Sequence, residues 1–220
     1  MDTIWNYRWL LLQGLGVTVQ VTVLAGLLAL ALGIATGLAR RGPPLIAWPV
    51  HIYVEVFRGT SALVQLFVLF FVLPGMGLRL DPMTCGVVGL GLCYGAYCSE
   101  VVRGALNNFP RAQREAAVAL NLTGTQTLTR VVLPQALLVM LPQLGNLMVE
   151  LLKASSLVSL ITLADLTFQA RSIMRLTLHT VEAMSVLLVA YFVLAQLISF
   201  GARALEARLG GAWRGRTEER

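Results

Sequence analysis

Few side chains in this sequence have the types and spacing that catalysis needs. Lys153 is the only lysine and follows Leu152, so the Gly-Lys pair with which a Walker A loop holds ATP phosphates does not occur. His51 and His179 are the only histidines, and neither belongs to a His-Glu-x-x-His zinc motif. A Gly-x-Ser-x-Gly nucleophile turn is missing as well. We therefore predict no catalytic residue, no metal site and no cofactor, and we expect any ATP to be hydrolysed by another chain.

One polar connection, residues 107–134, has the pattern of a docking segment. Residues 114–120 combine strong helix formers with an apolar side of Ala116, Ala117 and Leu120. Asn121 tolerates the left-handed conformation that ends a helix, and Thr123 or Thr125 can cap the next turn. The pattern predicts two short helices with a sharp bend. A compact helix with small residues on one side suits a groove on another protein; a plain amphipathic interfacial helix is the alternative.

Two copies of a Glu-x-x-Arg-Gly pattern place opposite charges at helical spacing. Glu55 and Arg58 form the first copy, and Glu100 and Arg103 form the second. A glutamate and an arginine three residues apart share a helix face and can pair, which lowers the cost of charge near the membrane interface. We interpret both as paired anchors at the inner interface. A role in transmitting movement from the 107–134 segment is the alternative.

A further set of residues breaks helices or carries polar groups inside apolar segments. Proline, glycine and asparagine near residue 145 interrupt the backbone hydrogen-bond ladder, which membrane proteins tolerate where the backbone lines a cavity. Glu150 and Lys153 can pair with each other or gate such a cavity. A helix kink and an interfacial ion pair are the alternatives. The predicted solute path comprises Gln65, Pro142, Gly145, Asn146, Glu150 and Lys153.

The composition places these residues in a membrane. The 220-residue chain is 57% hydrophobic and only 13% charged, with a mean hydropathy of +0.75, whereas soluble domains carry about a quarter charged residues. The net charge of +6 does not indicate nucleic acid, because no basic stripe alternates with aromatic residues. Arginine and lysine instead collect on the cytoplasmic side of membrane proteins. We therefore predict an all-α, polytopic integral membrane protein surrounded by lipid.

Five apolar segments approach the roughly 20 helical residues that cross a bilayer. They cover about 14–38, 56–74, 83–106, 135–152 and 183–205. Residues 155–180 are too short and interrupted to span, and predict a re-entrant or interfacial helix. Twelve of the 17 basic residues fall on the side of the 107–134 segment and the 206–220 tail. The chain is therefore expected to have residues 1–13 as a short extracytoplasmic N-terminus and its C-terminus in the cytoplasm.

The 107–134 segment also resembles a known motif. Glu115-Ala116-Ala117, the bend residue Asn121 and the closing Leu133-Pro134 are similar to the EAA loop of binding-protein-dependent ABC importer permeases. The resemblance extends over nearly the whole chain and implies an ABC type I importer transmembrane domain over 14–205, with the EAA loop docked in a groove of a separate ATPase. The family usually has glycine at the bend. Asparagine costs about 1 kcal/mol or less there, so we expect the bend to survive.

Other stretches narrow the resemblance. Residues 54–60 and 151–159 resemble the polar amino acid (histidine/glutamine-type) branch, and residues 58–65, 80–84 and 159–170 resemble ectoine/hydroxyectoine permeases. The resemblance implies uptake of polar amino acids or amino-acid-derived compatible solutes across a bacterial inner membrane. It also implies three kinds of partner: ABC ATPase subunits, a second permease (the same chain or a paralogue) and an extracytoplasmic solute-binding protein.

Two other classes of membrane protein compete with this interpretation. A self-powered secondary transporter is disfavoured, because five spans leave little room for paired inverted repeats and no acidic residue lies at mid-membrane. A membrane anchor subunit would have no need for the helix-breaking residues of the fourth span. Loss of uptake on removal of the ATPase, or on substitution of Pro142 or Asn146, discriminates between these classes.

Overall fold

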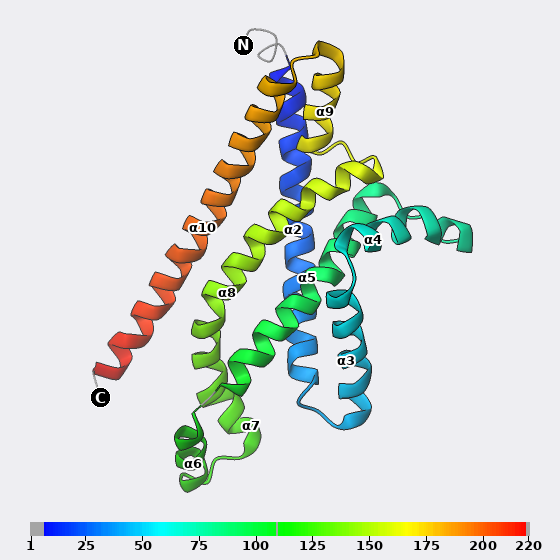
Figure 1. The fold of residues 1–220 in the computed structure, drawn as a ribbon. Coiled ribbons are helices and arrows are strands. Elements are labelled where there is room, and N and C mark those ends of the chain that lie inside the picture. The colour runs from blue at the N-terminus through cyan, green and yellow to red at the C-terminus, as the bar shows by residue number, and fades with distance from the viewer. Residues whose placement is uncertain (1–6, 109, 219–220) are drawn as a thin grey trace.

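The computed structural model describes residues 7–108 and 110–218, and within these ranges it is helical without strands (Figure 1). The helices are α2 (Arg8–Ala39), α3 (Pro44–Gly59), α4 (Ala62–Phe67), α5 (Pro82–Asn107), α6 (Arg111–Ala119), α7 (Gly124–Thr127), α8 (Leu133–Ala154), α9 (Leu166–Thr177) and α10 (Thr180–Glu218). Two π-helical turns, Val68–Val72 and Leu128–Val132, and two 3₁₀ segments, Leu73–Met76 and Ser155–Ile161, continue them. The predicted all-α class is confirmed.

Within the described residues, four helical stretches are long and apolar enough to cross a membrane: Arg8–Ala39, Pro82–Asn107, Gly124–Ile161 and Thr180–Leu209. A bent pair, Pro44–Gly59 with Ala62–Met76, makes a fifth if it is counted as one span. The prediction of about five spans is therefore confirmed. α9 has only 12 residues, about 18 Å of helix, and is too short to cross a bilayer.

The predicted span at 56–74 is not one helix. α3 begins at Pro44, ends at Gly59, and is followed by a turn of 104° into Ala62–Met76. Thr60 is extended, with φ −114° and ψ 154°, so the hydrogen-bond ladder stops there. The predicted range began at residue 56 and therefore left out most of α3, which begins at Pro44. A proline at the first position of a helix loses no hydrogen bond, and Pro44 starts α3 in this way.

The core is the close packing of α2 against α5. A side-chain Cβ at Gly33 would overlap Cys98, and one at Gly37 would overlap Val102. Glycine at these positions lets the two backbones approach closely, as is common between helices in membranes. The three thiols of α5 are buried, and none forms a disulfide within the described residues.

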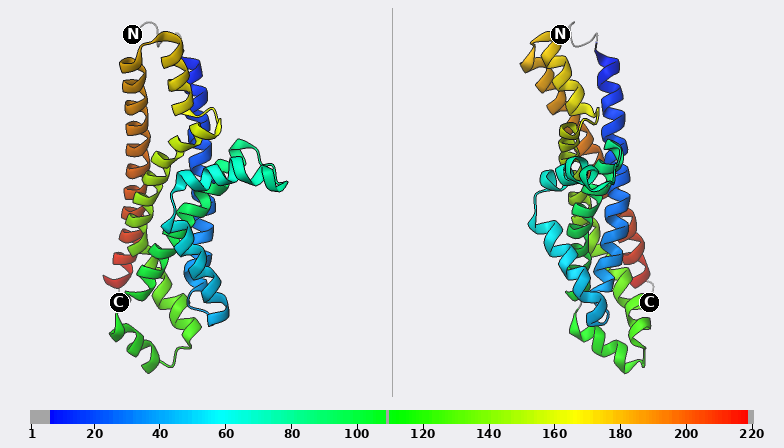
Figure 2. Two further views of the ribbon diagram at one scale, coloured as in Figure 1. Left: turned by 45° about the vertical axis from the view of Figure 1, so that its right-hand side comes forward. Right: turned by 90° about the vertical axis from the view of Figure 1, so that its right-hand side faces the viewer.

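The molecule has two distinct ends (Figures 1 and 2). The start of α2, α9 and the start of α10 lie together at one end, and the α2–α3 turn lies at the other with α6 and α7. α10 runs from the first end toward the second. Arg171 lies on α9, at the first end, and Arg40 directly follows α2 at the α2–α3 turn, at the second end.

Candidate functional site

The bend of the predicted EAA loop is a well-formed helix ending. α6 stops in a turn in which the N–H of Asn121 donates to the carbonyl of Val118 at 2.9 Å, and the N–H of Leu122 donates to that of Ala117 at 3.0 Å. Asn121 is left-handed, with φ 54°. These two bonds are those of a Schellman turn. Asn121 therefore adopts the conformation that was expected at the bend.

The second helix of the loop begins with a capping box. The Thr123 hydroxyl accepts the Gln126 N–H at 3.3 Å, and the Gln126 side-chain oxygen accepts the Thr123 N–H at 2.9 Å. Thr123, rather than Thr125, is the cap. Leu133 and Pro134 do not end the segment as expected, because a π turn at Leu128–Val132 leads directly into α8. The wider turn accommodates the proline near the start of α8 without breaking the helix.

α6 exposes an apolar surface at its end of the molecule. Val118 and Leu120 are 71% and 73% exposed, and Glu115 and Ala116 are exposed as well. Ala117, which was expected on the same side as Ala116 and Leu120, is only 4% exposed. It lies about 100° around the helix from Ala116 and faces inward. Exposed large apolar side chains outside the membrane spans mark an interaction surface.

Glu100, near the end of α5, contacts arginines from three elements. Arg103 donates through Nε and Nη2 to Oε2 of Glu100 at 3.0 and 2.6 Å. Arg40 donates through Nη1 to Oε1, and Arg58 Nη1 lies 3.8 Å from the same oxygen. The structure therefore contains the predicted ion pair between Glu100 and Arg103.

The expected pair between Glu55 and Arg58 is absent. Among the described residues, Glu55 forms no ion pair and its side chain is exposed. Arg58 instead approaches Glu100 and lies with its guanidinium carbon 5.6 Å from the centre of the Tyr97 ring. α3 packs beside α5, so Arg58 reaches a less exposed carboxylate and an aromatic face in place of an exposed neighbour. Interhelical packing decides this pairing, and helical spacing does not.

Gln65 closes the break between α3 and α4. Its Nε2 donates to the Phe57 carbonyl at 2.9 Å and to the Thr60 hydroxyl at 2.8 Å. The Phe57 carbonyl needs this partner because the helix ends at Gly59. The Oε1 atom of Gln65 is buried and has no hydrogen-bond partner in the described part of the chain. Gln65, which was predicted to line the solute path, therefore stabilises the bend between α3 and α4.

Three of the predicted path residues line one polar cavity of about 320 Å³ between α8 and α10. They are Pro142, Gly145 and Asn146. The α10 side of the cavity is formed mainly by polar and charged residues. These are Gln196, Ser199, Arg203 and Glu206.

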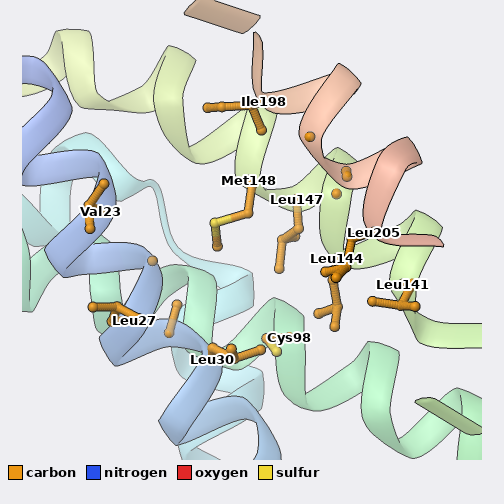
Figure 3. A pocket seen from close by; sticks show the side chains of 15 residues that line it. Val23, Leu27, Leu30, Cys98, Leu141, Leu144, Leu147, Met148, Ile198 and Leu205 are labelled. Atoms are coloured by element: carbon orange, nitrogen blue, oxygen red, sulfur yellow. The ribbon is translucent and has the colours of Figure 1, made fainter. Parts of the chain in front are cut away.

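A second, apolar cavity of about 410 Å³ adjoins the polar one at Gly145 and Ala202, which line both (Figure 3). It lies between α2, α8 and α10. The labelled side chains that surround it are aliphatic, with the sulfur atoms of Met148 and Cys98 as the only heteroatoms among them. Because none of its described lining residues is charged or carries an amide, it suits hydrocarbon and does not suit a zwitterionic solute.

Glu150 and Lys153 lie apart from the polar cavity. Both side chains are exposed, and neither lines that cavity. No ion pair joins them in the part of the chain that the structure describes. The Glu150 carbonyl accepts the Tyr94 hydroxyl at 3.2 Å. The six predicted path residues are thus divided among the α3–α4 bend, the α8–α10 cavity and the end of α8.

The polar side of α10 was not predicted from the sequence. Gln196, Ser199, Arg203 and Glu206 follow one another at intervals of three or four residues. This spacing places them on one helix face. The signal was present in the fifth apolar segment, which was predicted only as a membrane span.

Asp165 is a second site that sequence reasoning did not identify. Its carboxylate caps α9 by accepting the Phe168 N–H at 2.8 Å, and the Tyr191 hydroxyl of α10 lies 3.5 Å from its other oxygen. The following N–H, of Leu166, donates to the Thr18 hydroxyl of α2 at 3.0 Å. Burial raises the pKa of Asp165 to about 6. This polar cluster connects α9 with α2 and α10.

Known proteins resemble this chain along most of its length. The family model for the inner membrane component of binding-protein-dependent transport systems matches residues 29–211. The probable amino-acid ABC transporter permease protein y4tF of Sinorhizobium fredii (strain NBRC 101917 / NGR234) is 41% identical, over 92% of this chain and 88% of its own length. The glutamine transport system permease protein GlnP of Escherichia coli (strain K12) is 37% identical, over 94% and 96%.

The fold agrees with these sequence matches. A crystal structure of an amino acid ABC transporter with histidines superimposes with a TM-score of 0.88 at 32% identity, covering 93% of this chain and 96% of the other. The predicted type I importer fold and the prediction of a transport subunit rather than an enzyme are both confirmed. The chain belongs to the family of inner membrane components of binding-protein-dependent transport systems.

Proposed function

We propose that this chain forms the solute pathway of an importer for amino acids or amino-acid-derived compatible solutes, and that ectoine or hydroxyectoine is its substrate. The observation that carries the proposal is the exposed end of α6, which a Schellman turn at Asn121 holds beyond the membrane spans. Glu115, Ala116 and Asn121 of the EAA loop dock in a groove of a separate ATPase. The buried side chain of Ala117 lies behind this surface.

The solute class is argued from relatives and from the polar cavity. GlnP is a glutamine permease by its name, and y4tF is a probable amino-acid permease. In the cavity, Arg203 and Glu206 offer opposite charges beside the amides of Asn146 and Gln196. A zwitterion needs a cation for its carboxylate and an anion or carbonyl for its positive group. Ectoine and α-amino acids share that chemistry, and the resemblance of residues 58–65, 80–84 and 159–170 to ectoine permeases is the reason for naming ectoine.

The partners and the orientation follow from the same proposal. An extracytoplasmic binding protein delivers solute at the end that carries α9, a second permease completes the pathway, and two ATPases bind at the α6 end. The chain lies in the bacterial inner membrane with its N-terminus outside and its C-terminus in the cytoplasm. The segregation of Arg40, Arg103 and the α6 loop from Arg171 supports this orientation.

Reconstitution tests the proposed function. We would place the permease in proteoliposomes with its ATPase and binding protein, and measure uptake of labelled ectoine with unlabelled glutamine as competitor. The proposal predicts ATP-dependent uptake that an uncoupler leaves intact and that glutamine inhibits weakly. Uptake that survives without the ATPase and collapses with the uncoupler would establish a secondary transporter. Strong inhibition by glutamine would assign the importer to amino acids in place of ectoine.

A further inference from the structure

Arginines from several elements contact the side chain of Glu100. It is 19% exposed and accepts hydrogen bonds from Arg40, at the end of α2, and from Arg103, on α5. Arg58, near the end of α3, contributes a third guanidinium at 3.8 Å. One carboxylate thus connects three helices. Because Arg40 is only 10% exposed, removing its partner would leave a poorly hydrated charge unpaired.

Two further contacts tie the α2–α3 turn to its surroundings. Arg40 Nη2 lies 2.7 Å from Nδ1 of His51 on α3. Arg41 donates to the Leu106 carbonyl, in the last turn of α5, at 2.7 Å. Arg41 also lines a cavity of about 340 Å³ with Val118 and Leu122 of the EAA loop. The turn therefore contacts the end of α5 and lies against the loop itself.

α3 is interrupted directly after the turn that carries Arg58, because the helix ends at Gly59. Thr60 and Ser61 are extended, and the chain bends by 104° before α4. Gln65 bridges this break with hydrogen bonds to Phe57 and Thr60. A short extended link between two helices can absorb changes in backbone angles while the helices remain intact, as hinge residues do.

We propose that Glu100 is a positioning residue that makes the ends of α2, α3 and α5 one rigid unit with the EAA loop, and that this unit turns about Thr60 and Ser61. Movement of α6 would then shift α5 and α3 together and change the α3–α4 bend. The inference rests on the proposed docking of an ATPase at α6. It goes beyond docking because it assigns the path along which the movement reaches the membrane.

The sequence provides a matched control. Glu55 occupies the same position as Glu100 in the other Glu-x-x-Arg-Gly copy, but it is exposed and lacks an ion pair among the described residues. Glu100→Gln removes the charge from the shared contact, whereas Glu55→Gln removes an equivalent charge outside it. Glu100→Asp keeps the charge on a shorter side chain.

We would reconstitute the complete transporter with each variant and measure ATPase co-purification, ATP hydrolysis and solute taken up per ATP. Glu100→Gln is expected to retain the ATPase and hydrolysis but to lower uptake per ATP by about tenfold, the size of a typical coupling between sites. Glu100→Asp should recover part of that loss, and Glu55→Gln should match the unmodified protein. Failure of docking itself would appear as lost co-purification, which separates the two proposals.

Unchanged uptake per ATP in Glu100→Gln, or an equal loss in Glu55→Gln, would overturn the inference. If Glu100→Gln does not assemble, Arg58→Gln provides the test, because it removes only the outermost cation and leaves the two closer contacts. A smaller but measurable fall in uptake per ATP is expected. No fall, or a fall in parallel with lost assembly, would show that the cluster acts only as an anchor.

Discussion

At the scale of the residue, Asn121 determines the shape of the EAA loop. Its left-handed conformation allows the two hydrogen bonds that end α6 and turn the chain toward α7. The residue type and its position predicted this conformation, because asparagine is among the few residues that adopt positive φ without a large penalty. The inward turn of Ala117 was not predictable from the same stretch, since it depends on what lies behind α6.

Substitutions at Asn121 should show whether the bend needs a residue with positive φ or needs the asparagine side chain itself. Asn121→Gly is expected to retain uptake, because glycine adopts positive φ freely. Asn121→Ala should lower the stability of the bend by about 1 kcal/mol and reduce the amount of ATPase that co-purifies. Quantifying the ATPase bound per permease would check this. Equal binding by the two variants would mean that the bend is not needed.

Burial in the folded protein makes ionisation of the Asp165 carboxyl unfavourable. This carboxyl has a pKa of about 6 in the folded protein, against an ordinary value of 3.8. The folded protein therefore binds this proton more tightly than the unfolded chain does. The resulting stabilisation is complete below about pH 4 and is lost as the pH rises through about 6.

Comparison of Asp165→Asn with the unmodified protein should reveal this dependence. Asparagine still accepts the Phe168 N–H but does not ionise, so Tm of the unmodified protein should fall relative to Tm of Asp165→Asn between pH 4 and pH 7. Asp165→Ala should be less stable than Asp165→Asn at every pH by about 1 kcal/mol, because alanine does not ionise either but loses the α9 cap. A Tm difference between the unmodified protein and Asp165→Asn that does not change with pH would contradict the assignment.

At the scale of the element, the long helices were predictable and the bends were not. α2, α5 and α10 arise from apolar runs that only a bilayer can accommodate, so their positions follow from hydropathy. The 104° turn at Thr60 has a weak local signal, because Gly59 and Thr60 lower helix propensity without excluding a helix. The pairing of Arg58 with Glu100 depends on how α3 packs against α5. The lining of the polar cavity between α8 and α10 was predicted only in part, because polar residues on α10 complete it.

The contact between α8 and α10 offers a test at this scale. A Cβ at Gly145 would lie 2.7 Å from the Cβ of Ala202, whereas a Cβ at Gly201 would meet nothing within 4 Å. Gly145→Ala should force the helices apart and cost about 1–3 kcal/mol through overpacking. Gly201→Ala should be neutral or slightly stabilising because alanine favours helix.

Thermal unfolding of the two variants in the same detergent, together with uptake, would measure the difference. A Tm for Gly145→Ala equal to that for Gly201→Ala would show that the close contact between α8 and α10 is not maintained in the functional protein.

At the scale of the whole molecule, two ends with different chemistry are joined by membrane-spanning helices. The buried polar cluster at Asp165 fixes α9 at one end, and the arginines around Glu100 fix the α2–α3 turn at the other (Figure 1). The polar cavity lies between α8 and α10. In the proposed function, solute arrives at the first end and the ATPase acts at the second. Under the proposed function a few side chains in that cavity contact the solute, and fold-level patterns do not determine which solute they accept.

The proposed binding of the ATPase to the exposed surface of α6 can be tested by charge reversal at Glu115. We would compare Glu115→Lys with Gln113→Lys, which adds a positive charge on the other side of the same helix, by measuring co-purification of the ATPase and ATP-driven uptake. The account predicts that Glu115→Lys loses both while Gln113→Lys retains both. If Glu115→Lys still bound its ATPase and supported uptake at the rate of the unmodified protein, the proposed docking surface would be wrong.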